Sequence, residues 1–214
     1  MLPGGAAAGS QDTMQQTELT NLALDCGLAG NDFPMARVQN SAIGAQTSAH
    51  TPNPASAQDS ATPAEIKAAI TPKTKAIFIE VLANPGGVVL DVEAIAAIAK
   101  DAGIPLIVDN TLATPYLCRP IEWGADIVCH SMTKFLQGHG TSVGGVIVES
   151  DKFDWTCANG GPGYPTMTEP DPAYHGLTFY ETFGDFGFTM KARAVALRDF
   201  GPALSPTNAF NTLT

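Results

Sequence analysis

Residues 91–134 read DVEAIAAIAKDAGIPLIVDNTLATPYLCRPIEWGADIVCHSMTK, and this stretch decides the fold. Apolar residues recur at helical spacing from Asp91 to Ala102, and Gly103 is placed to end that helix. Two apolar runs follow, at 104–108 and 125–129, and both are short and nearly continuous. Strands that are apolar throughout belong to parallel sheets covered on both sides. The stretch therefore predicts an α/β fold, a mostly parallel sheet with helices on both faces.

The segments on either side extend this pattern. Thr62-Pro63-Ala64-Glu65 has the form of a capping box, and it predicts a helix from there to about Ile70. Residues 75–82 and 143–149 are two more apolar runs and are expected to be strands. Residues 1–61 contain no lysine and show weak apolar periodicity. We expect 62–214 to be the core of one domain and 1–61 to be its divergent, weakly structured N-terminal part.

Composition narrows the function classes. The 214 residues are 44% hydrophobic and 15% charged, which is typical of a globular protein. A formal net charge of −10 argues against nucleic acid as a partner, because phosphate contacts need Lys and Arg. No apolar run is long enough to span a membrane, and no secretory signal is recognisable. The four cysteines form no CxxC pair, so we expect reduced thiols, no metal site and a cytoplasmic location.

Polar residues stand where three of the expected strands end. Glu80 and Asn84 follow the first run, Asp109 follows the second, and His130 to Lys134 follow the third. In parallel α/β sheets, ligands bind beyond the carboxyl ends of the strands. We therefore expect these residues to converge on one site.

The residue types at these strand ends suit one cofactor. Lys134 offers an amine for a Schiff base, although most lysines are simply surface residues. Ser131 and Thr133 could donate to a phosphate or could only cap a turn. Asp109 could pair with a pyridinium nitrogen or cap the turn that follows it. Together they suggest pyridoxal 5'-phosphate, whereas His130 is expected to pack or bond locally. No GxGxxG follows a strand, which excludes a dinucleotide-binding enzyme.

The sequence IPLIVDNTLATPYLCRPIEWGADIVCHSMTKFLQGHGTSVGGVIVES resembles the Cys/Met-metabolism family of pyridoxal phosphate enzymes, which has the aspartate aminotransferase-like type I fold. The resemblance runs from about Thr62 to the C-terminus. It implies that Lys134 is the Schiff-base lysine and proton shuttle, and that Asp109 binds the pyridine nitrogen. Listed by implied role, the remaining cofactor residues are Ser131 and Thr133 on the phosphate, Asn84 near the ring hydroxyl, and Thr111 orienting Asp109.

The chain also departs from that family. The family's glycine-containing phosphate loop falls on residues 11–14, Gln-Asp-Thr-Met, and Asp12 would repel a phosphate. The family's stacking tyrosine falls within residues 43–47, which contain no aromatic side chain. Between His50 and Thr62 a polar, proline-containing segment replaces an expected strand. We expect the chain to lack the N-terminal arm and the C-terminal small domain that the family has.

Within the family, the part of the sequence after Asp151 looks like that of the O-acetylhomoserine sulfhydrylases. This resemblance implies γ-replacement on O-acetyl-L-homoserine by sulfide or a thiol, giving homocysteine or methionine and acetate. It also implies a homo-oligomer. Two alternatives stay open: a cystathionine γ-synthase or methionine γ-lyase activity, and a non-catalytic remnant of the fold that binds cofactor weakly or not at all.

Overall fold

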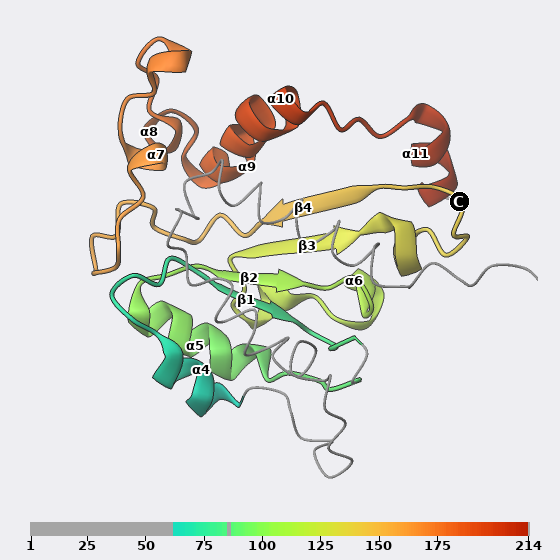
Figure 1. The fold of residues 1–214 in the computed structure, drawn as a ribbon, viewed down its shortest axis with the longest axis horizontal. Coiled ribbons are helices and arrows are strands. Elements are labelled where there is room, and N and C mark those ends of the chain that lie inside the picture. Colours follow the sequence, from blue (N-terminus) through green and yellow to red (C-terminus); the bar gives the residue numbers. More distant parts are fainter. Residues whose placement is uncertain (1–61, 85–86, 214) are drawn as a thin grey trace, which may run out of the picture.

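A computed structural model describes residues 62–84 and 87–213, and these form a four-stranded sheet with helices packed against it (Figure 1). The strands are β1 (Ile77–Glu80), β2 (Leu106–Asp109), β3 (Ile127–Ser131) and β4 (Gly145–Glu149), and they lie in the order β1-β2-β3-β4. Strands β1, β2 and β3 are parallel, while β4 is antiparallel to β3. The expected mostly parallel sheet is confirmed. Strands β2 and β3 each begin and end later than their apolar runs, and so reach Asp109 and Ser131.

The first described helix, α4 (Pro63–Ala69), begins as the sequence predicts. The Thr62 hydroxyl accepts a hydrogen bond from the backbone N–H of Glu65, and the Glu65 carboxylate accepts one from the N–H of Thr62. This capping box satisfies two N–H groups that a helix start otherwise leaves unpaired. Ile66 is fully buried and attaches the short helix to the core.

The crossover helix α5 (Val92–Ala102) connects β1 to β2. Asp91 caps its start by accepting from the N–H of Ala94, and Gly103 ends it in the left-handed conformation. Gly103 is required for a second reason. A Cβ there would lie 2.2 Å from the carbonyl oxygen of Gly160, so the backbone of the 157–163 loop packs directly on the helix end.

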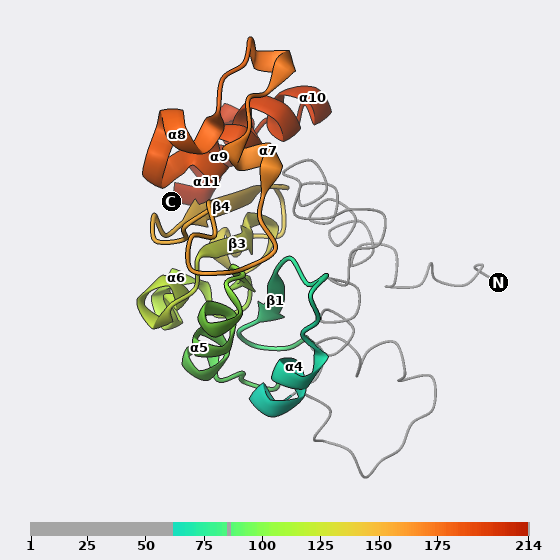
Figure 2. The same cartoon turned by 90° about the vertical axis from the view of Figure 1, so that its left-hand side faces the viewer.

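Helices lie on both sides of the sheet (Figure 2), and the cores beneath them differ in composition. One face is aliphatic, and α4 and α5 pack there. The other face is aromatic, with Trp155, Tyr164, Phe179 and Phe188 packed over Phe78 and Ile107. The rings of Trp155 and Phe188 are stacked, 5.3 Å between centroids. Helices thus pack on both faces, as predicted.

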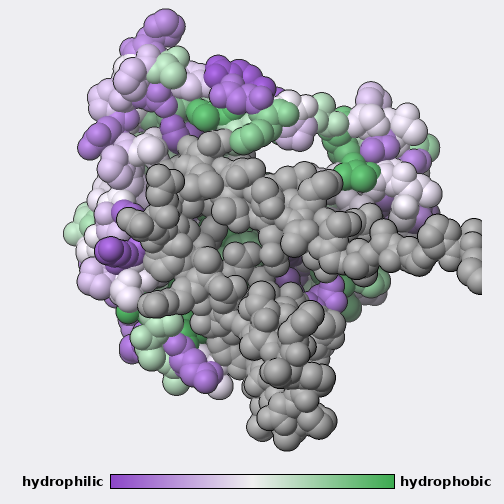
Figure 3. All heavy atoms as spheres, in the orientation of Figure 1, coloured by the Kyte–Doolittle hydropathy of each residue, from purple (hydrophilic) through white to green (hydrophobic). Residues whose placement is uncertain are grey.

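The chain after β4 forms a set of short helices: α7 (Pro165–Thr168), α8 (Phe179–Phe183), α9 (Gly187–Lys191), α10 (Arg198–Phe200) and α11 (Pro206–Leu213). Glu149, the last residue of β4, connects one of them, α9, to the sheet. Its carboxylate accepts hydrogen bonds from the N–H groups of Phe188 and Thr189, at 3.3 and 2.8 Å, and from the Thr189 hydroxyl. Hydrophobic side chains remain exposed on α10 and α11, including Phe200 and Phe210. Figure 3 shows green, hydrophobic surface among the hydrophilic residues of this part of the molecule.

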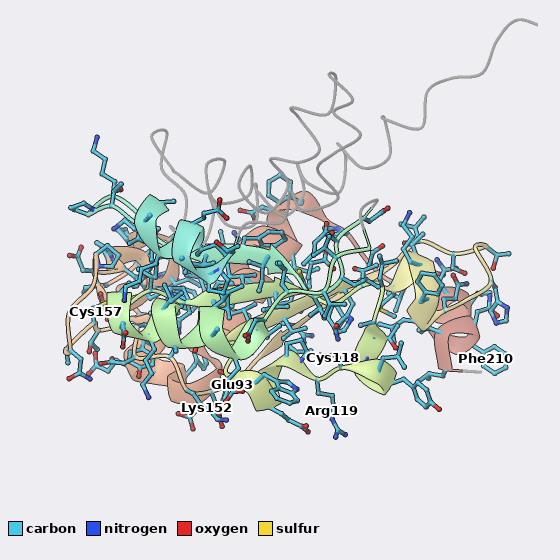
Figure 4. The ribbon with its side chains drawn as sticks, turned by 90° about the horizontal axis from the view of Figure 1, so that it is seen from below. Glu93, Cys118, Arg119, Lys152, Cys157 and Phe210 are labelled. Carbon is cyan, nitrogen blue, oxygen red and sulfur yellow. The ribbon has the colours of Figure 1, made fainter. Side chains whose placement is uncertain are left out.

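Within the described ranges, no helix is long and apolar enough to cross a membrane. The three cysteines there, Cys118, Cys129 and Cys157, are free thiols. Cys118 and Cys157 lie well apart in the molecule (Figure 4). Among these same residues, no group of His, Cys, Asp and Glu is arranged to hold a metal ion.

Candidate active site

The parallel strands place their last residues side by side. Glu80 of β1 is the register partner of Asp109 in β2, and Asp109 is the partner of Cys129 in β3. Register partners in a parallel sheet point to the same face. Lys134 is the third residue after the end of β3, in the turn that leaves the edge where the strands have their carboxyl ends. The structure therefore brings three of the sequence-predicted strand ends to one edge of the sheet.

Asp109 is half-buried, and its carboxylate is oriented by the chain that follows. Its Oδ1 accepts a hydrogen bond of 2.8 Å from the backbone N–H of Thr111. In the described part of the chain, Asp109 forms no salt bridge with a lysine or arginine. A carboxylate held in this way keeps its second oxygen available for a cationic ligand group.

Thr111 also connects the ends of β2 and β3. Its hydroxyl accepts a hydrogen bond of 2.8 Å from the backbone N–H of Ser131. One residue therefore fixes both the Asp109 carboxylate and the start of the segment that leads to Lys134. The hydrogen bond from the Thr111 N–H to Asp109 is the contact that the predicted orienting role of Thr111 requires.

Two buried polar residues, His130 and Asn110, also connect the ends of β3 and β2. The Nδ1 of His130 lies 3.1 Å from the carbonyl oxygen of Asn110, so that the imidazole donates to it. Burial lowers the pKa of His130, although the bond to Asn110 and the charge of Asp109 oppose that shift. His130 is 5% exposed, which confirms the prediction that it packs and bonds locally. It links the end of β3 to the residue that follows β2.

Asn110 was not identified by sequence reasoning, yet it organises the loop after Asp109. It is 1% exposed, and its Nδ2 donates to the carbonyl of Cys118 at 2.8 Å. Within that loop Thr114 has a positive φ of 59°, an uncommon conformation for a β-branched residue. The Asn110 side-chain oxygen is buried with no partner among the described atoms. Its position directly after a strand-end carboxylate is the only sequence signal that could have identified it.

Thr133 is anchored to the loop before β4. Its hydroxyl donates to the carbonyl of Gly144 at 3.3 Å and accepts from the N–H of Gly144 at 3.1 Å. The hydroxyl proton, which a phosphate would need, is thus directed at backbone in this conformation. The structure places Ser131 and Thr133 two residues apart at the end of β3, but it shows the Thr133 hydroxyl bonded to the chain itself.

Lys134 occupies an irregular backbone position. It lies inside the π-helical turn Met132–Leu136, and its φ of −94° and ψ of −120° are not helical. The side chain is half-buried, and no described residue forms a hydrogen bond or an ion pair with its amine. Such backbone irregularities are frequent at functional sites.

Asn84 is exposed and lies in the turn that follows β1. Its backbone N–H donates to the Glu80 carboxylate at 3.0 Å. The chain reverses direction after Ala83, whose backbone N–H donates to the carbonyl of Val88 at 2.9 Å. Asn84 therefore lies at the carboxyl end of β1, at the same sheet edge as Asp109.

Three of the sequence expectations concern residues outside the described part. The altered phosphate loop at 11–14, the missing aromatic ring within 43–47 and the polar segment between His50 and Thr62 all fall before the first described residue.

The side chains gathered here fit pyridoxal phosphate by their chemistry. The cofactor needs an amine for its aldehyde, an anion for its ring nitrogen and donors for its phosphate. Lys134 provides an uncommitted amine within the described chain, and Asp109 provides an oriented carboxylate on the adjoining strand end. Fold and site together have the features of the pyridoxal phosphate-dependent class of α/β proteins.

Comparison with known proteins makes this assignment specific. Residues 46–214 match the model of the family described as Cys/Met metabolism PLP-dependent enzyme. The chain belongs to this family. The match begins earlier than the resemblance at Thr62 and includes part of the N-terminal region.

Individual relatives agree with the family. The O-acetyl-L-homoserine sulfhydrylase of Leptospira meyeri is 47% identical over 163 residues, which cover 72% of this chain and 36% of that protein. The O-acetyl-L-homoserine sulfhydrylase of Corynebacterium glutamicum is 48% identical over 149 residues, covering 69% of this chain and 34% of that protein. The chain thus spans about a third of the length of the curated relatives it matches.

Solved structures show the same fold. A putative O-acetylhomoserine (thiol)-lyase from Campylobacter jejuni superimposes with a TM-score of 0.64 at 37% identity, covering 70% of this chain and 37% of that one. In that structure a lysine carries a pyridoxyl phosphate group. The O-acetylhomoserine sulfhydrylase of Wolinella succinogenes superimposes with a TM-score of 0.56 at 36% identity, covering 71% and 39% of the two chains.

Proposed function

We propose that this protein takes part in γ-replacement on O-acetyl-L-homoserine, in which sulfide or a thiol displaces acetate to give homocysteine or methionine. The proposal is supported by relatives named O-acetyl-L-homoserine sulfhydrylase that are 47% and 48% identical to the chain. The observation that carries it is the hydrogen-bonded link from Asp109 through Thr111 to Ser131, three residues before Lys134. This link joins the two groups that the chemistry requires.

In this proposal each strand end has one task. Lys134 binds the cofactor covalently through Nζ and moves the α and β protons of the substrate. Asp109 binds the ring nitrogen, and Thr111 orients Asp109. When bound, pyridoxal phosphate supplies an electron sink for the substrate carbanion.

The remaining cofactor contacts are assigned to neighbouring residues. Ser131 and Thr133 bind the phosphate, and Asn84 lies near the ring hydroxyl. For Thr133 this requires its hydroxyl to turn away from the Gly144 carbonyl, which now accepts its proton. Because the Gly144 N–H can still donate to the same oxygen, and the Thr133 N–H donates to the Gly144 carbonyl, that rotation leaves Thr133 held by two hydrogen bonds.

Several further aspects are proposals of the same kind. Residues 62–214 form the core of the cofactor domain, and residues 1–61 are its N-terminal part. The substrates are a small amino acid and sulfide or a thiol, and the protein assembles as a homo-oligomer. The cytoplasmic location, expected from the cysteine pattern, stays a prediction.

Cofactor attachment tests the core of the proposal. The protein is incubated with pyridoxal phosphate, reduced with borohydride and mapped by peptide mass spectrometry. We expect a pyridoxyl group on Lys134 and none on Lys67, Lys73 or Lys75, which serve as internal controls. A protein that stays colourless and unlabelled would instead support the non-catalytic remnant, and labelling at a different lysine would refute the assignment of Lys134.

The reaction itself is tested by product analysis. Protein incubated with pyridoxal phosphate, and not reduced, is mixed with O-acetyl-L-homoserine and sulfide, and homocysteine and acetate are measured. Cysteine as the only sulfur donor distinguishes a cystathionine γ-synthase, and methionine alone as substrate distinguishes a γ-lyase. Acetate release that depends on sulfide supports the replacement reaction.

A further inference from the structure

Glu80 stands next to Asp109 and has no role in the function proposed above. It is the last residue of β1, as Asp109 is the last residue of β2, and the two are register partners. Neighbouring strands lie about 4.8 Å apart, and register partners of a parallel pair point to the same face. Both side chains are half-buried. Two carboxylates therefore lie side by side at the sheet edge that carries the candidate site.

The pKa of Cys129, in the neighbouring strand β3, is affected by the charges of both Asp109 and Glu80. Cys129 is the register partner of Asp109 on its other side, and it is 5% exposed. Burial raises the pKa of the Cys129 thiol, and the charges of Asp109 and, to a smaller extent, Glu80 raise it further. Both carboxylates thus contribute negative potential to the same face of the sheet.

Glu80 is also hydrogen-bonded to a residue of the candidate site. Its Oε2 accepts a hydrogen bond of 3.0 Å from the backbone N–H of Asn84, the residue assigned to the ring hydroxyl. The carboxylate spans the start of the turn after β1. Removing it would release the first residue of that turn.

Glu80 and Asp109 present two half-buried carboxylates to the same face of the sheet, and both attract a cation placed against that face. We propose that Glu80 is a positioning residue of the cofactor site, which fixes the Asn84 turn and adds a second negative charge beside Asp109 to favour the protonated ring nitrogen of pyridoxal phosphate. This inference rests on the proposed function, since it assumes that the cofactor binds with its ring nitrogen at Asp109.

Two substitutions separate the two roles. In Glu80→Gln the charge is lost, but the side-chain oxygen can still accept from the Asn84 N–H. In Glu80→Asp the charge is kept, but the shorter side chain withdraws from Asn84. Circular dichroism and thermal unfolding of both variants establish that each is folded as the unsubstituted protein is.

Cofactor titration tests the charge role. Dissociation constants are measured for pyridoxal phosphate and for its 1-deaza analogue, in which CH replaces the ring nitrogen. A shift of one unit in the ring-nitrogen pKa corresponds to about a tenfold change in the preference for the protonated ring. We expect Glu80→Gln to weaken pyridoxal phosphate about tenfold and the analogue less than twofold, while Glu80→Asp keeps the preference for the natural ring. Equal effects on the two ligands, or no effect on either, would overturn the charge role.

Amide hydrogen exchange tests the turn role without cofactor. The Asn84 amide is expected to exchange at least severalfold faster in Glu80→Asp and to stay near its original rate in Glu80→Gln. An unchanged rate in Glu80→Asp would overturn it. If the unsubstituted protein fails to bind pyridoxal phosphate at all, the proposed function and the charge role fail together, whereas binding with no change in the variants defeats only the role of Glu80.

Discussion

Two lysines in this protein lie in opposite kinds of environment. Lys191, in α9, is 3% exposed, and its amine lies 3.0 Å from the Asp171 carboxylate and 4.4 Å from the centre of the Phe179 ring. Lys134 lies in an irregular turn at the sheet edge, and within the described chain its amine has neither an ion pair nor a hydrogen bond. The Lys191 amine is therefore paired with groups of the protein itself, whereas no described residue pairs with the Lys134 amine.

The difference shows what distinguishes a structural amine from a reactive one. Burial opposes ionisation of Asp171, but the hydrogen bonds from Lys191 and from the Ala173 N–H, with the charge of Lys191, keep its pKa below the ordinary value. The pair thus stabilises both charges. A lysine that is to react with an aldehyde must keep its amine free of such a partner.

The strongest test of this comparison is substitution of Lys134. In Lys134→Ala we expect complete loss of borohydride-trapped cofactor, because the only amine assigned to it is removed. Stability is expected to change by less than about 0.5 kcal/mol, since no described interaction of the amine is lost. Mass spectrometry and urea unfolding measure the two effects. Retained labelling would remove the distinction between the lysines.

The reverse pattern is expected for Lys191. Lys191→Ala leaves the Asp171 carboxylate unpaired in a partly buried position and should cost about 2–4 kcal/mol in the free energy of unfolding. Cofactor attachment to Lys134 should persist at temperatures where the variant is folded. A double variant, Lys191→Met with Asp171→Asn, is the control and should recover part of the loss. A loss below 0.5 kcal/mol in Lys191→Ala would show that the pair is not structural.

Asp126 is a second carboxylate to compare with Asp171. Its hydrogen bond and the nearby positive charge do not offset the effect of burial on its pKa. Burial raises its pKa to about 6, although the Leu106 N–H, at 2.8 Å, and the charge of Lys152 oppose the shift. Because the folded state holds this proton more tightly than the unfolded chain, its contribution to stability falls as pH rises from about 4 to about 6. The difference is at most about 3 kcal/mol.

Urea unfolding at several pH values measures this effect. The Asp126→Asn variant should lack the decline, because an amide does not titrate, and the difference between the two proteins should level off above pH 6. Asp171 contributes in the opposite direction, since its lowered pKa adds stability that is lost as pH falls through that value. A pH-independent difference between Asp126→Asn and the original protein would contradict the assignment.

The smallest effect is expected at the surface. The Arg119–Glu122 ion pair is 2.8 Å long, but its side chains are 65% and 58% exposed. Glu122→Gln should change the free energy of unfolding by less than about 0.5 kcal/mol. Comparing Glu122→Gln with Lys191→Ala shows how much of the loss of stability comes from breaking an ion pair and how much from the burial of that pair. A loss as large as that in Lys191→Ala would mean that exposure does not explain the contrast.

Local signals account for the parts of the fold that the sequence predicted. The capping box at Thr62 and the helix end at Gly103 are formed by residues close together in the chain, so both can be predicted without knowledge of the fold. The convergence of Asp109 and the Lys134 segment could also be predicted, because parallel strands align their carboxyl ends.

Other features depend on contacts between distant residues. The direction of β4 was not predicted, because an apolar run such as 143–149 has the same pattern in either direction. The bonds between Thr133 and Gly144 follow from that direction, because they join the two ends of the connection between β3 and β4. The aromatic core around Trp155 was missed because its rings are scattered over residues 153–188 with no period.

The antiparallel pairing of β3 with β4 has a consequence for how the protein folds. The connection from Ser131 to Gly145, which contains Lys134, is the shortest one between paired strands of the described sheet. Closing a short loop costs less entropy than closing a long one, and local contacts form faster than distant ones. We expect β3 and β4 to pair early, with the lysine already in their connecting segment, and β2 to add its carboxylate later.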